Sequence, residues 1–115
     1  MSLQVKICGL KSPEPLEVAL ESGADLVGFV FFPPSPRHLG LEAARQLSAQ
    51  VRRRAEKVAL SVDANDETLH SIVDALKPDW LQMHGSESVE AVAVDAIVAL
   101  PVRVRVGRRS IDALH

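Results

Sequence analysis

Short apolar runs alternate along this chain with longer segments in which apolar residues recur every three or four positions. The short runs predict buried strands, and the longer segments predict amphipathic helices. Predicted strands cover residues 4–8, 26–31, 57–62, 80–84 and 101–106. Predicted helices cover residues 13–22, 41–54, 67–76 and 88–99, and a further helix is expected to begin at Ser110.

Local signals sharpen two parts of this pattern. Ser12 is a suitable N-cap, Pro13 suits the first helical position, and Gly23 suits the end of the same helix. Residues 32–40 contain three prolines, and proline restricts both its own φ angle and the residue before it. We therefore expect a stiff loop after the second strand.

The strand–helix repeat, with a period of about 25 residues, predicts an α/β fold with a parallel sheet and right-handed crossovers. An open doubly wound sheet and a (β/α)8 barrel both fit. No G-x-G-x-x-G motif follows the first strand, which argues against a dinucleotide-binding domain. A complete barrel needs about 200 residues or more, so if the fold is a barrel, this single domain of 115 residues is only about its first half.

Composition narrows the cellular setting. One cysteine excludes an intramolecular disulfide and favours a cytoplasmic protein. A net charge of -2 gives no reason to expect nucleic-acid binding, and no apolar run is long enough to span a membrane. The start of the chain lacks the pattern of a signal peptide. We therefore expect neither nucleic acid nor a membrane as a partner.

Candidate chemistry gathers where the predicted strands end. Lys6 and Cys8 alternate along the first strand and so share one face, and Gln82 and His84 do the same in the fourth. In parallel α/β folds the carboxyl ends of the strands meet at one edge, which also receives Asp63. A free cysteine is often simply a small buried residue, and buried polar side chains can be satisfied by water or by a neighbouring strand.

Basic residues give a weaker signal. Arg37 follows the proline-rich segment, and a stiff loop could hold its guanidinium over the site to bind a carboxylate. An ordinary surface arginine is the alternative. Residues 52–54 suit a solvated helix end, and the alternation of residues 102–106 suits an edge strand. Cys8, His38 and His84 lack local metal-ligand spacing, so neither a metal nor another cofactor is expected.

Several segments together resemble the phosphoribosylanthranilate isomerase family, a group of (β/α)8-barrel enzymes of tryptophan biosynthesis. The matching segments are residues 5–10 (VKICGL), 23–25 (GAD), 28–31 (GFVF), 34–37 (PSPR), 62–63 (VD) and 81–85 (LQMHG). They occur in the family's order and with similar spacing. The likeness covers residues 4–90, and residues 91–115 depart from the family pattern.

The resemblance implies an Amadori rearrangement of N-(5'-phosphoribosyl)anthranilate to the carboxyphenylamino-deoxyribulose phosphate. It assigns the general base to Cys8 and binding of the anthranilate carboxylate to Arg37, while Gln82, His84 and Lys6 line the substrate site. The family's acid is an aspartate on a later strand, and its phosphate site lies on the last loops. We therefore expect this chain to be truncated and inactive alone.

Two other functions fit the sequence. The chain could be a non-enzymatic half-barrel that needs a complementary chain or associates with itself through open sheet edges and inner apolar residues such as Val58, Leu60 and Val62. It could also be a hydrolase with Cys8 as nucleophile and His84 as base. The second alternative lacks a nucleophile-elbow sequence.

Overall fold

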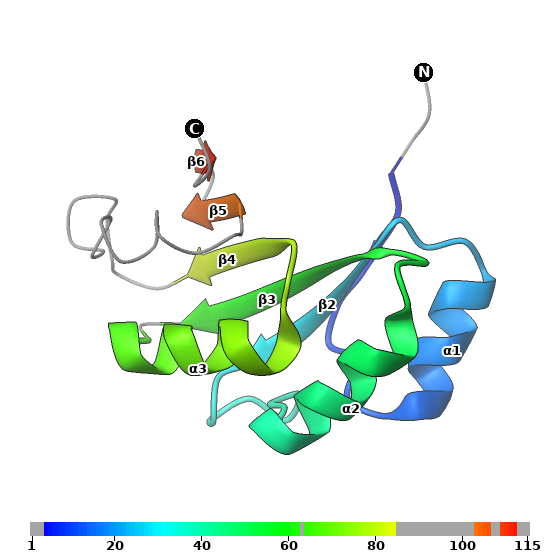
Figure 1. Ribbon diagram of the computed structural model, residues 1–115, viewed down its shortest axis with the longest axis horizontal. Coiled ribbons are helices and arrows are strands. Elements are labelled where there is room, and N and C mark those ends of the chain that lie inside the picture. The colour runs from blue at the N-terminus through cyan, green and yellow to red at the C-terminus, as the bar shows by residue number, and fades with distance from the viewer. Residues whose placement is uncertain (1–3, 63, 85–102, 107–108, 113–115) are drawn as a thin grey trace.

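The computed structural model describes residues 4–62, 64–84, 103–106 and 109–112 (Figure 1). The elements are β1 (Lys6–Ile7), α1 (Pro13–Glu21), β2 (Leu26–Phe31), α2 (Leu41–Val51), β3 (Glu56–Val62), α3 (Asp66–Leu76), β4 (Trp80–His84), β5 (Arg103–Val106) and β6 (Arg109–Asp112). All described helices lie on the same side of the sheet. The predicted alternation of strands and helices is confirmed from β1 to β4.

One sheet contains all the described strands in the order β1-β2-β3-β4-β5-β6. Neighbours from β1 to β5 pair in parallel, whereas β6 runs antiparallel to β5. The α/β class with a parallel βαβα sheet is therefore confirmed. The predicted helix at residues 88–99 lies outside the described residues.

The last elements correct two sequence predictions. The helix expected from Ser110 is wrong, because Ser110 lies in β6 and pairs with Arg105. β5 is also not an edge strand, since β4 and β6 flank it. Pairing with β5 instead gives the backbone of the Ser110 segment hydrogen-bond partners.

Helix ends differ from the prediction by a few residues. α2 ends at Val51 rather than at residue 54, because Arg52 and Arg53 adopt positive φ angles of 49° and 62°. At the start of α3, Asn65 Oδ1 accepts a hydrogen bond of 2.8 Å from the Thr68 amide. This cap places the helix start at Asp66.

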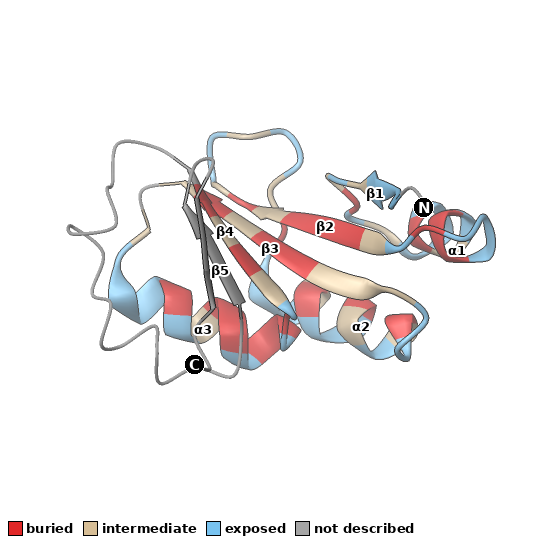
Figure 2. Cartoon of the chain, turned by 90° about the horizontal axis from the view of Figure 1, so that it is seen from above, coloured by how far each residue is buried: buried red, intermediate tan, exposed pale blue. Residues whose placement is uncertain are grey.

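The two faces of the sheet have different environments. Buried residues alternate with less buried ones along β4 and the second half of β3, as the two-residue period of a strand requires, whereas residues 27–29 of β2 are all buried (Figure 2). Facing the helices, one hydrophobic core joins strand residues to the helices: Val27, Phe29, Phe31, Ala59, Leu81 and Met83 with Leu16, Ala44, Leu47, Leu69 and Ile72. The opposite, inner face carries Lys6, Cys8, Gly28, Leu60 and Gln82.

The sheet is strongly curved. Lys6 Nζ in β1 donates a hydrogen bond to Gln82 Oε1 in β4, although two strands separate them. The two residues are also offset along the strand direction. Gln82 pairs with Leu60, and Leu60 pairs with Val30, whereas Lys6 pairs with Leu26, which lies four residues before Val30 in β2. In a flat sheet with strands about 4.8 Å apart, their Cα atoms would be roughly 19 Å apart, beyond the combined reach of both side chains. The inner face is therefore concave.

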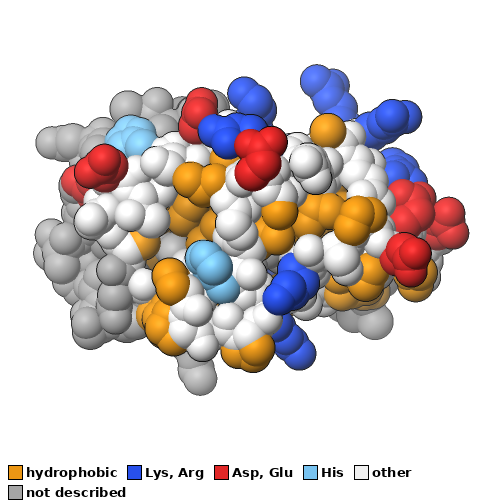
Figure 3. All heavy atoms as spheres, turned by 90° about the horizontal axis from the view of Figure 1, so that it is seen from below, with side chains coloured by type: hydrophobic (Ala, Val, Ile, Leu, Met, Phe, Trp, Pro, Cys, Tyr) orange, Lys and Arg blue, Asp and Glu red, His pale blue; other side chains and the backbone are white. Residues whose placement is uncertain are grey.

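The helix side of the molecule has a polar margin. Hydrophobic side chains are visible in a band across the view in Figure 3, and charged side chains lie mostly around them. Val18 is the most exposed of the large hydrophobic residues described, at 63%. Within the described residues, no helix combines the length and apolar character required to cross a membrane.

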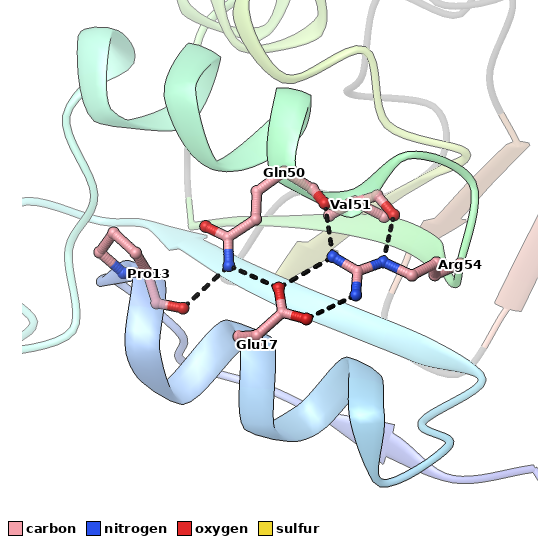
Figure 4. A network of polar contacts seen from close by, with 5 residues as sticks. All are labelled: Pro13, Glu17, Gln50, Val51 and Arg54. Atoms are coloured by element: carbon pink, nitrogen blue, oxygen red, sulfur yellow. Dashed lines mark hydrogen bonds and ion pairs between the residues drawn. The ribbon is translucent and has the colours of Figure 1, made fainter.

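A polar network joins α1 to the end of α2 (Figure 4). Arg54 donates to both carboxylate oxygens of Glu17 at 2.6 and 2.9 Å, and Gln50 Nε2 donates to Glu17 at 3.1 Å and to the Pro13 carbonyl at 2.9 Å. The hydrogen bonds from Arg54, followed by that from Gln50, lower the pKa of Glu17 to about 2. The unusual backbone after Val51 directs Arg54 to this network.

This network predicts an acid-dependent loss of stability. The pKa of Glu17 is lower in the folded chain than the ordinary 4.5, so its contribution is complete above pH 4.5 and declines as the pH falls towards 2. We expect the urea midpoint, followed by circular dichroism, to depend less on pH in this window for Glu17→Gln. Glu42→Gln is the matched control, because Glu42 pairs with Arg45 at 3.4 Å in an exposed contact. An unchanged pH profile in Glu17→Gln would contradict this.

Candidate functional site

Cys8 lies immediately after β1, on the inner face of the sheet. It is a free and exposed cysteine. The next two residues fix its position, because the amides of Gly9 and Leu10 both donate to the Gly28 carbonyl, at 3.0 and 3.2 Å. Gly9 has a positive φ of 80°, which turns the chain away from the strand direction. The thiol is therefore held at the carboxyl edge beside β2.

Gly28 in β2 provides the space for the thiol. A methyl group at Gly28 would lie 2.9 Å from Cys8 Sγ and 3.3 Å from Cys8 Cα. The sequence analysis did not identify this position. The available signal was a glycine inside an otherwise apolar strand, because such a glycine often marks close approach of another chain segment.

A side chain at Gly28 should displace Cys8. We expect Gly28→Ser to lower the free energy of unfolding by about 1–3 kcal/mol through overpacking and to change the rate of Cys8 alkylation by iodoacetamide. Gly40→Ser is the matched control, since a side chain there meets nothing within 4 Å and serine suits the N-cap of α2. If Gly28→Ser leaves the free energy of unfolding and the alkylation rate as unchanged as the control does, the contact between Gly28 and Cys8 is not tight.

The structure brings Arg37 to the segment that carries Cys8. A methyl group at Gly9 would lie 3.1 Å from Arg37 Nη1 and 3.2 Å from Nε. The guanidinium therefore rests against the backbone next to Cys8, where only a glycine leaves room for it. Within the loop, the Arg37 amide donates to Ser35 Oγ at 3.1 Å. Thus the loop after β2 places a cation against the segment that carries Cys8.

Lys6 and Gln82 complete the described part of the site. Both lie on the concave inner face and are joined by their side-chain hydrogen bond. Lys6 precedes Cys8 by two residues and shares its face, so a second cation lies on the thiol's side of the sheet. The site therefore combines a thiol, two cations and an amide on a face open to solvent.

The position of His84 is known only through its backbone. It ends β4 and pairs with Val62 at the end of β3. The side chain of His84 and the whole of Asp63 lie outside what the structure describes, so their predicted contribution to the site stays a prediction. The described side chains include no group of three or more His, Cys, Asp or Glu residues that could hold a metal ion.

These contacts define what the site can do chemically. A cysteine can act as a base by accepting a proton as its thiolate. A guanidinium binds a carboxylate through two parallel hydrogen bonds. The arrangement therefore suits an anionic ligand whose carboxylate binds near Arg37 and whose other atoms reach Cys8.

A family model described as "N-(5'phosphoribosyl)anthranilate (PRA) isomerase" matches residues 5–113. Among individual proteins, the N-(5'-phosphoribosyl)anthranilate isomerase of Nitrobacter winogradskyi is 59% identical over 108 residues, which are 93% of this chain and 48% of the relative. That of Bradyrhizobium diazoefficiens is 67% identical over 89 residues, or 77% of this chain and 40% of the relative. The resemblance found in the sequence motifs is confirmed.

Solved structures show the same likeness. Phosphoribosyl anthranilate isomerase from Thermotoga maritima matches with a TM-score of 0.82 and 30% identity, covering 91% of this chain and 50% of that protein. The enzyme from Jonesia denitrificans gives a TM-score of 0.80 at 28% identity, with coverage of 91% and 50%. This chain thus spans about half the length of the relatives it matches, and the prediction of a partial barrel is confirmed.

One solved neighbour contains a ligand. It is a phosphoribosyl anthranilate isomerase in complex with reduced 1-(o-carboxyphenylamino)-1-deoxyribulose 5-phosphate, and it matches with a TM-score of 0.74 at 34% identity. The match covers 78% of this chain and 46% of that protein. The ligand of that neighbour carries both a carboxylate and a phosphate.

Proposed function

Because the chain belongs to the N-(5'-phosphoribosyl)anthranilate isomerase family, we propose that it carries the base-bearing half of that enzyme's active site. Its substrate is N-(5'-phosphoribosyl)anthranilate, and its reaction is the Amadori rearrangement of tryptophan biosynthesis. Cys8 is the general base and Arg37 binds the anthranilate carboxylate. The observation that supports these roles best is the position of the Arg37 guanidinium against Gly9, directly after Cys8.

The chemistry of the substrate fits this spacing. Anthranilate has its carboxylate next to its nitrogen on the ring, and the sugar carbon that loses a proton is two bonds beyond that nitrogen. A carboxylate held by Arg37 therefore places this carbon within reach of a base on the neighbouring strand end. Cys8 takes the proton after the furanose ring has opened, and the electron pair moves to form the enol that becomes the ketose.

Lys6 and Gln82 act on the sugar in this proposal. Their hydrogen bond lies on the concave face, where donors and acceptors can bind sugar hydroxyls. His84 belongs to the same group by its position at the end of β4. No cofactor is required, because proton transfer alone converts the aminoaldose to the aminoketose.

The general acid and the phosphate site are supplied by the second half of the barrel, as the family resemblance implies. Residues 1–115 then form a single partial-barrel domain that has little or no turnover alone. A cytoplasmic location and self-association through open sheet edges are parts of the same proposal.

A chimeric barrel tests the proposed function directly. Residues 1–84 of this chain are fused to the remainder of the Nitrobacter winogradskyi relative, starting at the position that matches Gly85. We expect turnover within about tenfold of that relative, measured as the loss of substrate fluorescence. A chimera that unfolds cooperatively but has no turnover would overturn the proposal. The high identity of the two chains makes a compatible fold a fair starting point.

The second candidate is a non-enzymatic half-barrel. It is favoured by β1, which lies at the edge of the sheet: among the described strands it pairs with β2 on one side, and its other side is open. In that case the chimera would fold but remain inactive, and the isolated chain would still bind a complementary half-barrel. The chimera thus separates the two functions.

A further inference from the structure

We propose that Lys11 is a positioning residue for Arg37, and that it does so by fixing the proline-rich loop to the segment that carries Cys8. This inference rests on the proposed function, since it concerns the placement of the carboxylate-binding group. Lys11 Nζ donates a hydrogen bond of 2.9 Å to the carbonyl of Pro36. Among the described residues, no other side chain from outside the loop donates a hydrogen bond to a residue of the loop.

The base of the loop is held by other contacts. The Leu39 amide donates to the Val30 carbonyl at 2.8 Å, His38 forms an isolated bridge with Val30, and Leu39 is buried at 3% exposure. These contacts join the end of the loop to β2. They hold the residues that follow Arg37 to β2, but none of them joins the loop to the segment that follows β1.

Prolines make this segment stiff without fixing its place. They restrict φ angles inside the loop, but a stiff loop can still pivot where it joins the sheet. Two hydrogen bonds inside the loop also stiffen it without fixing its place. They join the Ser35 amide to the Phe32 carbonyl at 2.8 Å and the His38 amide to the Ser35 carbonyl at 3.1 Å. A contact with another element is needed to set the loop against β1.

The contact from Lys11 acts on the peptide group that leads into Arg37. The oxygen of this group accepts from Lys11, and its nitrogen, the Arg37 amide, donates to Ser35 Oγ at 3.1 Å. Because a peptide group is planar and rigid, holding both of its ends fixes its orientation. Since the His38 amide also donates to the Ser35 carbonyl at 3.1 Å, the backbone is held on both sides of the Arg37 Cα, and this sets the direction of its side chain.

The same contact links Arg37 to the proposed base. Lys11 follows Cys8 by three residues, and between them Leu10 is buried at 7% exposure while the amides of Gly9 and Leu10 are bound to Gly28. The Lys11 backbone is thereby held at a constant place relative to the thiol. Residues 8–11 therefore carry both the base and the lysine that holds the Arg37 loop, so this segment sets the distance between Arg37 and Cys8.

Reagent selectivity of Cys8 tests this without any enzyme activity. Cys8 is the sole cysteine of the chain, so its reaction rates with anionic 5,5'-dithiobis(2-nitrobenzoate) and with neutral iodoacetamide can be measured directly. A cation beside the thiol attracts the anionic reagent. We expect Lys11→Met to lower the ratio of the anionic to the neutral rate by about two- to tenfold, the range of one lost hydrogen bond.

A double variant separates positioning from the charge of Lys11 itself. If Lys11 acts through Arg37, Lys11→Met lowers the ratio in the native chain but has little further effect in an Arg37→Met background. A full additional decrease in that background would overturn the proposal. Lys11→Arg should restore most of the ratio, and Arg45→Met, which removes an equal charge from an exposed pair on α2, should leave it unchanged.

The chimeric barrel gives a second measurement. There Lys11→Met should raise KM by about two- to tenfold with a smaller change in kcat, since Arg37 binds substrate and Cys8 remains in place. A decrease confined to kcat would overturn the proposal. If the chimera has no turnover but the reagent ratio behaves as expected, the proposed function fails while the positioning of Arg37 by Lys11 stands.

Discussion

Cys8→Ser in the chimeric barrel is expected to lower kcat by about 10²–10⁴-fold, the usual range for loss of a general acid–base group. A serine hydroxyl is far harder to ionise than a thiol and cannot accept the sugar proton at neutral pH. Binding should change little, because the side chains are similar in size and Arg37 still binds the carboxylate. Steady-state kinetics with freshly prepared phosphoribosylanthranilate measure both constants.

The exposed pair of Arg45 and Glu42 provides the control for this result. Arg45→Met in the same chimera should retain its kcat, because Arg45 lies on α2 and is half-exposed. Full activity of Cys8→Ser would remove Cys8 from the mechanism. The base would then have to be sought among the other residues at the carboxyl edge, beginning with His84.

The 115-residue chain on its own is expected to have no measurable turnover. The acid–base contribution of the missing partner group is about 10²–10⁴-fold, and the missing phosphate contacts would no longer hold the sugar in place. The same assay measures this, with the chimera as the positive control. Robust turnover by the isolated chain would show that an acid lies within it, and Asp63 and Asp112 would be the first positions to mutate.

The isolated chain should also associate with itself. Leu60 and Val62 lie partly exposed on the inner face of β3, next to the buried Val58, and open sheet edges and apolar faces favour association. Sedimentation should detect oligomers, and addition of the second half of the Nitrobacter relative should reduce them. A chain that stays monomeric at all concentrations would contradict this prediction, because its sheet edges and inner face would then need no partner.

Elements with two independent signals were predicted best. β2 and β4 have the predicted bounds, because each is a continuous apolar or alternating run between residues that favour turns. The end of α2 was placed too late, since apolar spacing extends through a helix end while the positive φ angles of Arg52 and Arg53 leave no such pattern. β6 was mistaken for a helix because pairing with β5 determined its structure.

The site was predictable to a similar degree. The two-residue period of a strand placed Lys6 and Cys8 on one face, and the motifs of residues 34–37 pointed to Arg37. What the sequence could not supply was contact between segments. Gly28 and Lys11 matter because of what they touch across the fold, and an exposed lysine next to a helix start has no signal that distinguishes it from a solvated one.

The curvature of the sheet has a consequence for how such a barrel is made. The hydrogen bond between Lys6 and Gln82 lies within the first four strands, so both residues that span the arc precede β5 in the chain. During synthesis the N-terminal part of a chain emerges first and can fold as a unit. A ribosome-bound nascent chain could therefore acquire its final bend early, and the remaining strands would be added to a template instead of bending a flat sheet.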